Sequence, residues 1–455
     1  MKEPGAILLV ACYELGHQPL AVAWPAAFLE QHGYAPEVMD VSVAPFEPGQ
    51  AARARLVAIS VPMHTALRLG VGIAERVREV NPDCHVCFYG LYAELNADWL
   101  LATCADSVLA GELESELVEL AARLERGERV RGVRSARLAK LAFPLPRRNA
   151  LPALDKYARL ERDGRLELTG YVEGSRGCKH ECRHCPIPPV YGGRFFVVPR
   201  DVVLADVRQL VAAGARHITF GDPDFLNGPG HAMALARALH AEFPEVTFDV
   251  TAKVEHLLRH RRLLPELAAL GCAFVVSAVE SLSDTVLGHL AKGHTRADFV
   301  EVLGLARAAG LTLRPTWVAF TPWTTLDDYR EMLDFIARER LVDHVDPVQY
   351  SIRLLVPPGS LLLEHEGMRP HLGALIQDAF HYHWTHPDPR MDRLHAEVSA
   401  AVATGADAKQ DAHVTFARIV ELADVAAGNT SDALVTAEAP PNRSRPPRLT
   451  EPWFC

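Results

Sequence analysis

The sequence has no apolar run that approaches the ~20 residues of a membrane-spanning helix. It also lacks an excess of basic residues: 47 lysines and arginines stand against 57 aspartates and glutamates, and the net charge is −10. This balance argues against a general nucleic-acid-binding protein, which needs a basic surface. The start of the chain leads directly into a short apolar run, Ala6–Ala11, so we expect no signal peptide.

Cysteine is scarce, and its distribution argues against a secreted disulfide scaffold. The 455 residues include nine cysteines, and three of these lie within one segment of eight residues. We therefore expect a soluble protein in a reducing, oxygen-poor cytoplasm. The cysteines at positions 12, 84, 87, 104 and 272 are interpreted as small core side chains.

The three clustered cysteines, Cys178, Cys182 and Cys185, have the spacing C-x3-C-x2-C. Three thiolates can bind three irons of a [4Fe–4S] cluster and leave the fourth iron open to a small molecule. An open coordination position indicates a catalytic rather than a structural metal centre. A zinc knuckle is the alternative, with His180 or His184 as the fourth ligand.

This segment resembles the cluster motif of the radical S-adenosylmethionine (radical SAM) superfamily. The resemblance implies that the open iron binds the amino and carboxylate groups of SAM, and that the reduced cluster cleaves a C–S bond to form a carbon radical. It also implies an electron donor such as flavodoxin or ferredoxin. The sequence departs from the family at His184, where an aromatic residue usually precedes the third cysteine, although an imidazole can still stack on adenine.

Alternating strand-like and helical segments predict an α/β protein. Residues 1–135 are expected to form a doubly wound, Rossmann-like domain, followed by a proline-rich linker over residues 136–166. Residues 167–362 carry repeated strand–helix units and resemble the partial (β/α)6 barrel of radical SAM proteins. In that barrel the cysteine segment follows the first strand, Glu167–Val172, and the sixth strand is Val348–Arg353.

The remaining residues, 363–455, are expected to form a helical and irregular C-terminal region. The residue pattern over residues 371–403 predicts a helix. From residue 404 the periodicity weakens and proline accumulates, which predicts a mobile tail.

The first domain resembles the cobalamin-binding domain that precedes many radical SAM barrels, most closely in Leu56–Met63 and Val108–Glu114. Whether cobalamin binds is left open by two features. The D-x-H-x-x-G signature that supplies an axial histidine is absent, and bulky residues, Leu91 and Tyr92, follow Gly90 where a corrin would need room. The alternative is a domain that only packs on the barrel.

Two segments at predicted strand ends are expected to line the SAM site. Gly221 allows a close approach of the backbone, and Asp222 and Asp224 can accept hydrogen bonds from the SAM ammonium group. An ordinary loop with a helix N-cap is the alternative for this turn. Glu280 and Ser281 resemble the G-[IV]-E-S segment of cobalamin-type radical SAM enzymes, which implies hydrogen bonds to the ribose or methionine part of SAM.

Arg353, near the last predicted strand of the barrel, is a further candidate. A guanidinium group can grip a carboxylate through two parallel hydrogen bonds. Arg353 is therefore expected to hold the carboxylate of SAM or of a substrate acid.

The last residues, Leu449–Cys455, resemble the tail of a radical SAM family that ends in Cys-Cys-Ala-Glu-Pro or Cys-selenocysteine-Ala-Glu-Pro. We hypothesise that the chain continues past Cys455 with selenocysteine, which requires a UGA codon at that position. A thiol or selenol there would be a soft nucleophile, so Cys455 is a candidate catalytic residue. The family includes the enzyme of arsinothricin biosynthesis, and the resemblance implies transfer of the 3-amino-3-carboxypropyl group of SAM to arsenite.

Two other functions stay open at this point. One is cobalamin-dependent methyl transfer, which the cobalamin content of the protein would distinguish. The other is a non-enzymatic iron–sulfur redox sensor, which cleavage of SAM would exclude. In each case the partner is a small molecule, and neither nucleic acid nor a membrane is expected.

Replacement of one cluster cysteine tests the metal assignment. We expect Cys182→Ala to abolish both the brown colour and SAM turnover, because two thiolates do not hold a [4Fe–4S] cluster with one open iron. Iron content and visible absorption after anaerobic reconstitution measure the effect. Retained iron absorption would mean that the ligands are misassigned.

Overall fold

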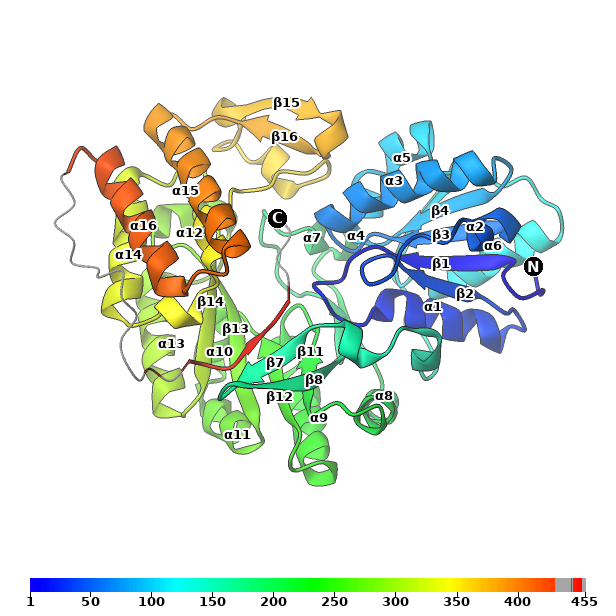
Figure 1. The fold of residues 1–455 in the computed structure, drawn as a ribbon, viewed down its shortest axis with the longest axis horizontal. Helices are drawn as coiled ribbons and strands as arrows, with labels where there is room; N and C mark the ends of the chain where they lie inside the picture. Colours follow the sequence, from blue (N-terminus) through cyan, green and yellow to red (C-terminus); the bar gives the residue numbers. More distant parts are fainter. Residues whose placement is uncertain (430–442, 444, 452–455) are drawn as a thin grey trace.

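The computed structural model describes residues 1–429, 443 and 445–451. It contains an N-terminal sheet covered by helices, a curled sheet with helices outside it, and a helical C-terminal region with a hairpin (Figure 1). The α/β fold class, with a Rossmann-like first part and a partial barrel, is confirmed. Within the described residues, no helix combines the length and hydrophobicity needed to cross a membrane.

The N-terminal sheet consists of six parallel strands in the order β2-β1-β3-β4-β5-β6. The strands are short and almost fully buried in the middle of the sheet, as expected when helices cover both faces. The strand order reverses between β1 and β3, and ligand crevices in such sheets lie at this point beyond the carboxyl ends of the strands. The strands are β1 (Ile7–Ala11), β2 (Glu37–Asp40), β3 (Leu56–Ser60), β4 (His85–Tyr89), β5 (Ser107–Gly111) and β6 (Val133–Arg137).

Six helices connect these strands: α1 (Leu20–Gln31), α2 (Pro48–Arg53), α3 (His64–Val80), α4 (Leu91–Leu95), α5 (Ala97–Thr103) and α6 (Glu114–Glu125). Helix α1 is apolar over most of its surface and packs against the barrel as well as against its own sheet. Its residues Trp24 and Phe28 belong to the same continuous core as the barrel side chains. The two sheets are therefore joined by shared apolar packing.

The curled sheet has the order β14-β13-β12-β11-β8-β7-β17. The five strands from β14 to β8 are parallel, and β7 and β17 add antiparallel neighbours at one edge. The strands are β7 (Arg159–Arg162), β8 (Arg165–Val172), β11 (His217–Phe220), β12 (Thr247–Thr251), β13 (Cys272–Glu280), β14 (Thr312–Trp317) and β17 (Arg448–Leu449). This sheet thus takes β7 from the predicted linker and β17 from the predicted tail.

Helices cover the outside of the curled sheet (Figure 1). The helices are α8 (Arg200–Ala212), α9 (Pro229–Glu242), α10 (Val254–Arg259), α11 (Leu264–Ala269), α12 (Asp284–Leu290), α13 (Arg296–Ala308) and α14 (Leu326–Arg338). Three short elements follow β8 and form the loop that carries the cysteines: β9 (Ser175–Gly177), α7 (Ile187–Tyr191) and β10 (Phe195–Val197).

The predicted sixth barrel strand, Val348–Arg353, is wrong. Residues Pro347–Ser351 form a 3-10 helix, and only Arg353 makes a single parallel bridge, to Phe320. Proline has no N–H to donate to a sheet ladder. Instead, the side-chain oxygen of Gln349 accepts a hydrogen bond of 2.9 Å from the backbone N–H of Trp317, which satisfies the edge of β14.

The helix predicted over residues 371–403 is wrong in its first part. Residues 372–384 form an antiparallel hairpin of β15 (Leu372–Ile376) and β16 (His381–Trp384), and helix α15 (Pro389–Asp407) begins only where Asp388 caps it. The indole N–H of Trp384 donates to the carbonyl of Leu354 over 2.7 Å. This long-range contact buries the tryptophan and favours the strand.

The expectation of an unstructured tail from residue 404 is also wrong in part. Helix α16 (Ala412–Ala426) lies within it, and Asp411 caps its first turn by accepting from the N–H of His413. Phe416, Ile419 and Ala423 form its buried face. Their spacing of three and four residues is that of an amphipathic helix, so the signal was present in the sequence.

The final described segment crosses the open side of the curled sheet (Figure 1). Arg443 pairs with Asp343 and Asp411, and Arg448 pairs with Glu161 on β7. The N–H of Thr450 donates to the carbonyl of Arg159, which extends the pairing of β17 with β7. The segment therefore forms part of the barrel wall.

A buried ion pair joins the linker to the barrel and yields a stability prediction. Arg148 donates to both carboxylate oxygens of Asp206 on α8, at 2.9 and 2.7 Å, and both side chains are at most 7% exposed. We expect Arg148→Ala to leave Asp206 buried without its partner, at a cost of about 3–5 kcal/mol. The midpoint of thermal unfolding, followed by calorimetry, measures this.

The neighbouring arginine provides a matched control for this prediction. Arg147 pairs with Glu30 at a partly exposed position. Its replacement by alanine should cost no more than about 1 kcal/mol. Equal shifts for the two variants would contradict the assignment of Arg148 as the anchor.

Candidate functional site

The three cysteines of the C-x3-C-x2-C segment lie together in the loop between β8 and α8, at the carboxyl end of the barrel. Cys178 and Cys182 are buried and Cys185 is partly exposed, and none of them forms a disulfide with a described residue. Burial raises the pKa of Cys185 to about 12, and the charges of Cys182 and Cys178 add to this. Burial also raises the pKa of Cys178. A bound cation would offset this cost, because metal ligation requires the thiolate form.

A buried lysine compensates part of the negative charge that a cluster would carry. Lys292 is 3% exposed, and its ammonium group lies 3.1 Å from Glu280 Oε1. Burial opposes its charge, but Glu280, Cys182 and Cys185 raise its pKa. The donor set of three thiols beside one cation fits a [4Fe–4S] cluster with an open iron.

Glu280 connects this cation to the cysteine loop. It ends β13 with a φ of 66°, a left-handed conformation that is uncommon for residues other than glycine. Its carboxylate contacts Lys292 and, at 3.2 Å, the Nε2 atom of His184. Burial opposes its ionisation, yet Lys292 and His184 hold the pKa of Glu280 at about 2. The structure thus brings the predicted site residues Glu280 and His184 into direct contact and adds Lys292, which sequence reasoning missed.

The turn after β11 is packed against the start of the cysteine loop. A Cβ on Gly221 would lie 2.0 Å from the hydroxyl of Tyr171, so the glycine makes room for that ring. Asp222 accepts hydrogen bonds from the N–H of Gly174, at 2.8 Å, and from the hydroxyl of Ser175, at 2.5 Å. Burial raises the pKa of Asp222 to about 7 despite these two donors. Its carboxylate therefore fixes the loop in addition to any contact with SAM.

Two further predicted residues have local partners. Asp224 Oδ1 accepts a hydrogen bond from the N–H of Leu226 and so caps a short 3-10 helix. For this oxygen, the alternative interpretation of the turn as a helix N-cap therefore applies. The hydroxyl of Ser281 accepts from the N–H of Ser283, which shapes the end of β13.

Arg353 pairs with side-chain and backbone groups of the C-terminal region. Its guanidinium group donates to Asp392 and to the carbonyl of Trp384, both at 2.8 Å, and its centre lies 3.6 Å from the centre of the Trp384 ring. These contacts join the barrel to the C-terminal region, and its role at a carboxylate stays a prediction. The other predicted catalytic residue, Cys455, lies outside the described residues.

A cavity of about 220 Å³, lined by both polar and apolar side chains, lies inside the barrel next to Gly221 and Asp222. Arg314 on β14 pairs with Asp346 at 3.0 Å, and Glu451 from the C-terminal segment lies 3.6 Å from His17 of the N-terminal domain. Burial raises the pKa of Glu451 to about 8, so its carboxyl group is largely protonated at neutral pH. Sequence reasoning missed these residues because they come from segments far apart in the chain.

The crevice between the two sheets is filled by a buried charged network. Arg176, from the cysteine loop, lies 2.7 Å from Glu114 and 3.0 Å from Glu173, and its guanidinium group lies over the ring of Trp24. The hydroxyl of Tyr191 donates to Glu112, which is fully buried at the carboxyl end of β5. These contacts tie the cysteine loop to the N-terminal sheet.

The residues of this crevice do not fit a corrin. The cavity there is about 170 Å³, below the ~300 Å³ at which small-molecule pockets begin. A Cβ on Gly90 would lie 3.1 Å from the carbonyl oxygen of Val61, so the turns after β3 and β4 nearly touch. A larger cavity of about 990 Å³ lies beyond the ends of β1 and β2, lined among others by Tyr13, Arg68 and Lys156.

Comparison with known proteins agrees with this site. Residues 172–336, which include most of the barrel, match the radical SAM superfamily. The curated relatives that match are enzymes. A tRNA-2-methylthio-N(6)-dimethylallyladenosine synthase of Desulfosudis oleivorans is 30% identical over 42% of this chain and 42% of its own length. A hopanoid C-3 methylase of Methylococcus capsulatus is 26% identical over 56% of this chain and 50% of its own length. The matched regions thus span about half of these relatives or less.

Two solved structures share the fold over most of the chain. The cobalamin-dependent radical SAM enzyme OxsB, with aqua-cobalamin bound, aligns with a TM-score of 0.66 and 14% identity, covering 91% of this chain and 72% of that one. The radical SAM methyltransferase TsrM from Kitasatospora setae, with cobalamin and a [4Fe–4S] cluster, aligns with a TM-score of 0.57 and 18% identity, covering 74% of this chain and 70% of that one. At such identities the likeness concerns the fold.

The Lys292–Glu280 pair yields a prediction on stability and its pH dependence. Lys292→Met should leave Glu280 buried without its cation and destabilise the cluster-free protein by about 3–5 kcal/mol. The pKa of Glu280 lies near 2 in the folded protein, below the ordinary value of 4.5, so the pair stabilises the fold fully above that value. The difference in thermal midpoint between wild type and variant should therefore shrink as the pH falls from about 4.5 toward 2.

Lys140→Met is the matched control, because Lys140 is exposed. It should change stability by no more than about 0.5 kcal/mol. A difference for Lys292→Met that stays constant at low pH would contradict the role of ionised Glu280.

Proposed function

We propose that this chain is an enzyme that binds a [4Fe–4S] cluster on Cys178, Cys182 and Cys185 and cleaves SAM reductively. The observation that carries this proposal is the convergence of three thiols and the Lys292–Glu280–His184 contacts at the carboxyl end of a radical SAM barrel. Barrel enzymes perform their chemistry at this end. A flavodoxin or ferredoxin in the cytoplasm would supply the electron.

When bound, the cluster supplies the electron that breaks a C–S bond of SAM. The chain's own residues hold and orient the reactants. Asp222 and the Gly221 backbone offer acceptors for the SAM ammonium group, and Glu280 and Ser281 offer groups for its ribose or methionine part. Lys292 offsets the negative charge of the thiolates. The N-terminal domain and the C-terminal segment cover the open side of the barrel, which excludes water from a reactive carbon radical.

The cavity inside the barrel supports a small polar acceptor. Its volume of about 220 Å³ is small, and Glu451, Arg314 and Asp346 line it. A protonated Glu451 can donate a hydrogen bond to an oxygen of the acceptor, while a side-chain oxygen of Asp346 can accept one. These groups suit a neutral molecule that carries hydroxyl groups.

We propose arsenite as this acceptor, with the 3-amino-3-carboxypropyl group of SAM as the group transferred. The support is the resemblance of Leu449–Cys455 to the tail of the arsinothricin-type family, together with the position of Glu451 in the barrel. Cys455 follows Glu451 by four positions in the sequence. Its thiol could bind trivalent arsenic as a soft ligand.

Cobalamin-dependent methyl transfer is the second candidate. It is favoured by the fold shared with OxsB and TsrM, whose structures contain cobalamin, and by the cavity of about 990 Å³ beside the ends of β1 and β2. The filled crevice at Arg176 and Tyr191 counts against it. Cobalamin content after anaerobic reconstitution separates the two candidates.

One product analysis tests the proposed reaction. Reconstituted protein is incubated anaerobically with dithionite, SAM and arsenite, and the products are identified by mass spectrometry. Transfer of the 3-amino-3-carboxypropyl group should yield an organoarsenical and 5′-methylthioadenosine in equal amounts. Cys182→Ala should yield neither. Formation of 5′-deoxyadenosine without the arsenical would contradict the arsenite proposal but retain SAM cleavage, and no cleavage at all would contradict both.

A further inference from the structure

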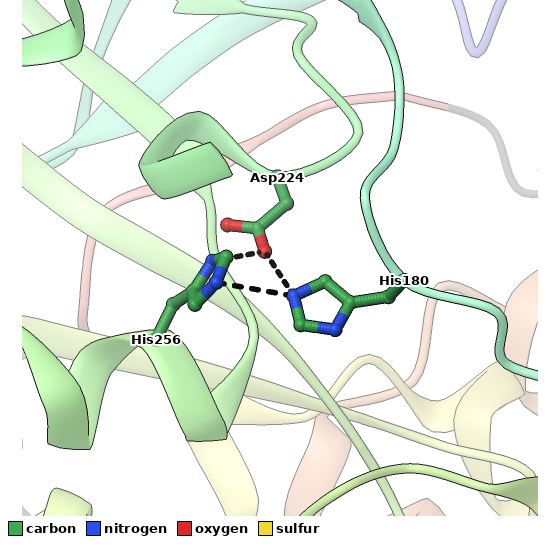
Figure 2. Close-up of side chains that lie close together, drawn as sticks. All are labelled: His180, Asp224 and His256. Atoms are coloured by element: carbon green, nitrogen blue, oxygen red, sulfur yellow. Dashed lines mark hydrogen bonds and ion pairs between the residues drawn. The ribbon is translucent and has the colours of Figure 1, made fainter. Parts of the chain in front are cut away.

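A second group of metal-binding side chains lies beside the cysteine loop and takes no part in the function proposed above. His180 stands between Cys178 and Cys182 in the sequence, Asp224 follows β11, and His256 lies on α10 after β12. Figure 2 shows the two imidazole rings and the carboxylate pointing toward one another. One ligand atom from each residue lies within 4.8 Å of the others.

The side chains are close enough to share one small cation, with either ring nitrogen of His256 as its ligand. The Nε2 atom of His256 lies 3.1 Å from His180 Nε2, its Nδ1 atom lies 2.7 Å from Asp224 Oδ2, and Asp224 Oδ2 lies 3.8 Å from His180 Nε2. Ligands that each lie about 2.0–2.2 Å from a metal ion are separated by about 3–4 Å. The three side chains are thus already placed for coordination.

Two of these atoms lack a hydrogen bond although they are buried. Asp224 Oδ2 and His256 Nδ1 form no hydrogen bond with the described residues, although the two atoms lie 2.7 Å apart as an ion pair. The Asp224 side chain is 0% exposed and that of His256 is 6% exposed. Buried polar atoms without partners are rare in proteins and indicate a missing ligand or ion.

A fourth side chain lies beside these three. Glu255 Oε2 lies 3.5 Å from His180 Nδ1, the ring nitrogen other than the one that faces His256 and Asp224.

We propose that His180, Asp224 and His256 bind a divalent transition-metal ion such as Zn²⁺ or Fe²⁺, at a site separate from the cysteine cluster. Two imidazoles and one carboxylate form a ligand set suited to these ions, with positions left open for water or a small ligand. Glu255 holds His180 through its other ring nitrogen, which is the usual arrangement around metal-bound histidine.

The surrounding charges are compatible with such an ion. Lys253 lies 3.6 Å from Glu255, so the nearest cation is offset by a carboxylate. The ring centre of His260 lies 5.8 Å from that of His256. This neighbouring histidine brings no further carboxylate to the site. Asp224 then supplies one negative charge directly to the ion.

The ion would join three segments that are far apart in the sequence. It would link the middle of the cysteine loop to the carboxyl ends of β11 and β12. His180 is two residues from both Cys178 and Cys182, so coordination would restrict the positions of both cysteines. The site would therefore stabilise the loop in the conformation that binds the cluster.

Metal analysis of the cluster-loaded protein tests the proposal without any turnover. The reconstituted protein is equilibrated with Zn²⁺, freed of loose metal, and analysed for iron and zinc by mass spectrometry. The wild type should hold about one zinc in addition to its cluster iron. His256→Ala should lower zinc affinity at least ~10-fold with unchanged iron. His260→Ala, which removes the neighbouring histidine, should bind zinc as the wild type does.

Two further measurements make the outcome decisive. X-ray absorption at the zinc edge should show nitrogen or oxygen ligands at about 2.0–2.1 Å and no sulfur at about 2.3 Å, which excludes zinc bound by the cysteines. Asp224→Asn keeps an oxygen to cap the 3-10 helix and should also weaken binding, which covers a failure of His256→Ala to fold. Zinc affinity unchanged in both variants, sulfur ligation, or no zinc in the wild type would overturn the proposal.

Discussion

The buried ion pair between Glu280 and Lys292 is the interaction on which the cysteine side of the barrel depends. Burial in a loop disfavours the charged form of three neighbouring thiols, and a nearby positive charge favours it. Lys292 supplies one such charge, and Glu280 holds it there while also reaching His184 in the loop. The strained backbone of Glu280 at the end of β13 persists because these contacts fix its side chain.

A second charged network decides how the two sheets meet. Arg176 lies among Glu112, Glu114 and Glu173 and packs on Trp24, so side chains occupy the crevice beyond the carboxyl ends of β4 and β5. The N-terminal domain thus shares its fold with cobalamin-binding proteins, while the larger open space, about 990 Å³, lies beyond the ends of β1 and β2. Its loop residue His17 reaches instead toward the barrel cavity, where it meets Glu451.

The fold was largely predictable from sequence because the strands of both sheets are short, buried apolar runs between helical segments. The failures have local causes. Where a sixth strand was predicted, the side chain of Gln349 accepts the hydrogen bond from the N–H of Trp317 on β14. Where a helix was predicted, Trp384 lies in a hairpin strand and its indole N–H donates to the carbonyl of Leu354. Such long-range hydrogen bonds leave no periodic signal in the sequence. The face of α16 did leave one, in the spacing of Phe416, Ile419 and Ala423.

The sequence by itself determined the cysteine spacing and the βα pattern, because three thiolates and a repeating apolar period are local properties of the chain. It also identified Asp222, Asp224 and Glu280 as residues at strand ends. Only the tertiary structure decided their partners. The pairing of Glu280 with Lys292, the meeting of His180 with His256, and the entry of Glu451 into the barrel join residues 12, 76 and hundreds of positions apart. Such proximity depends on how the strands curl and pack.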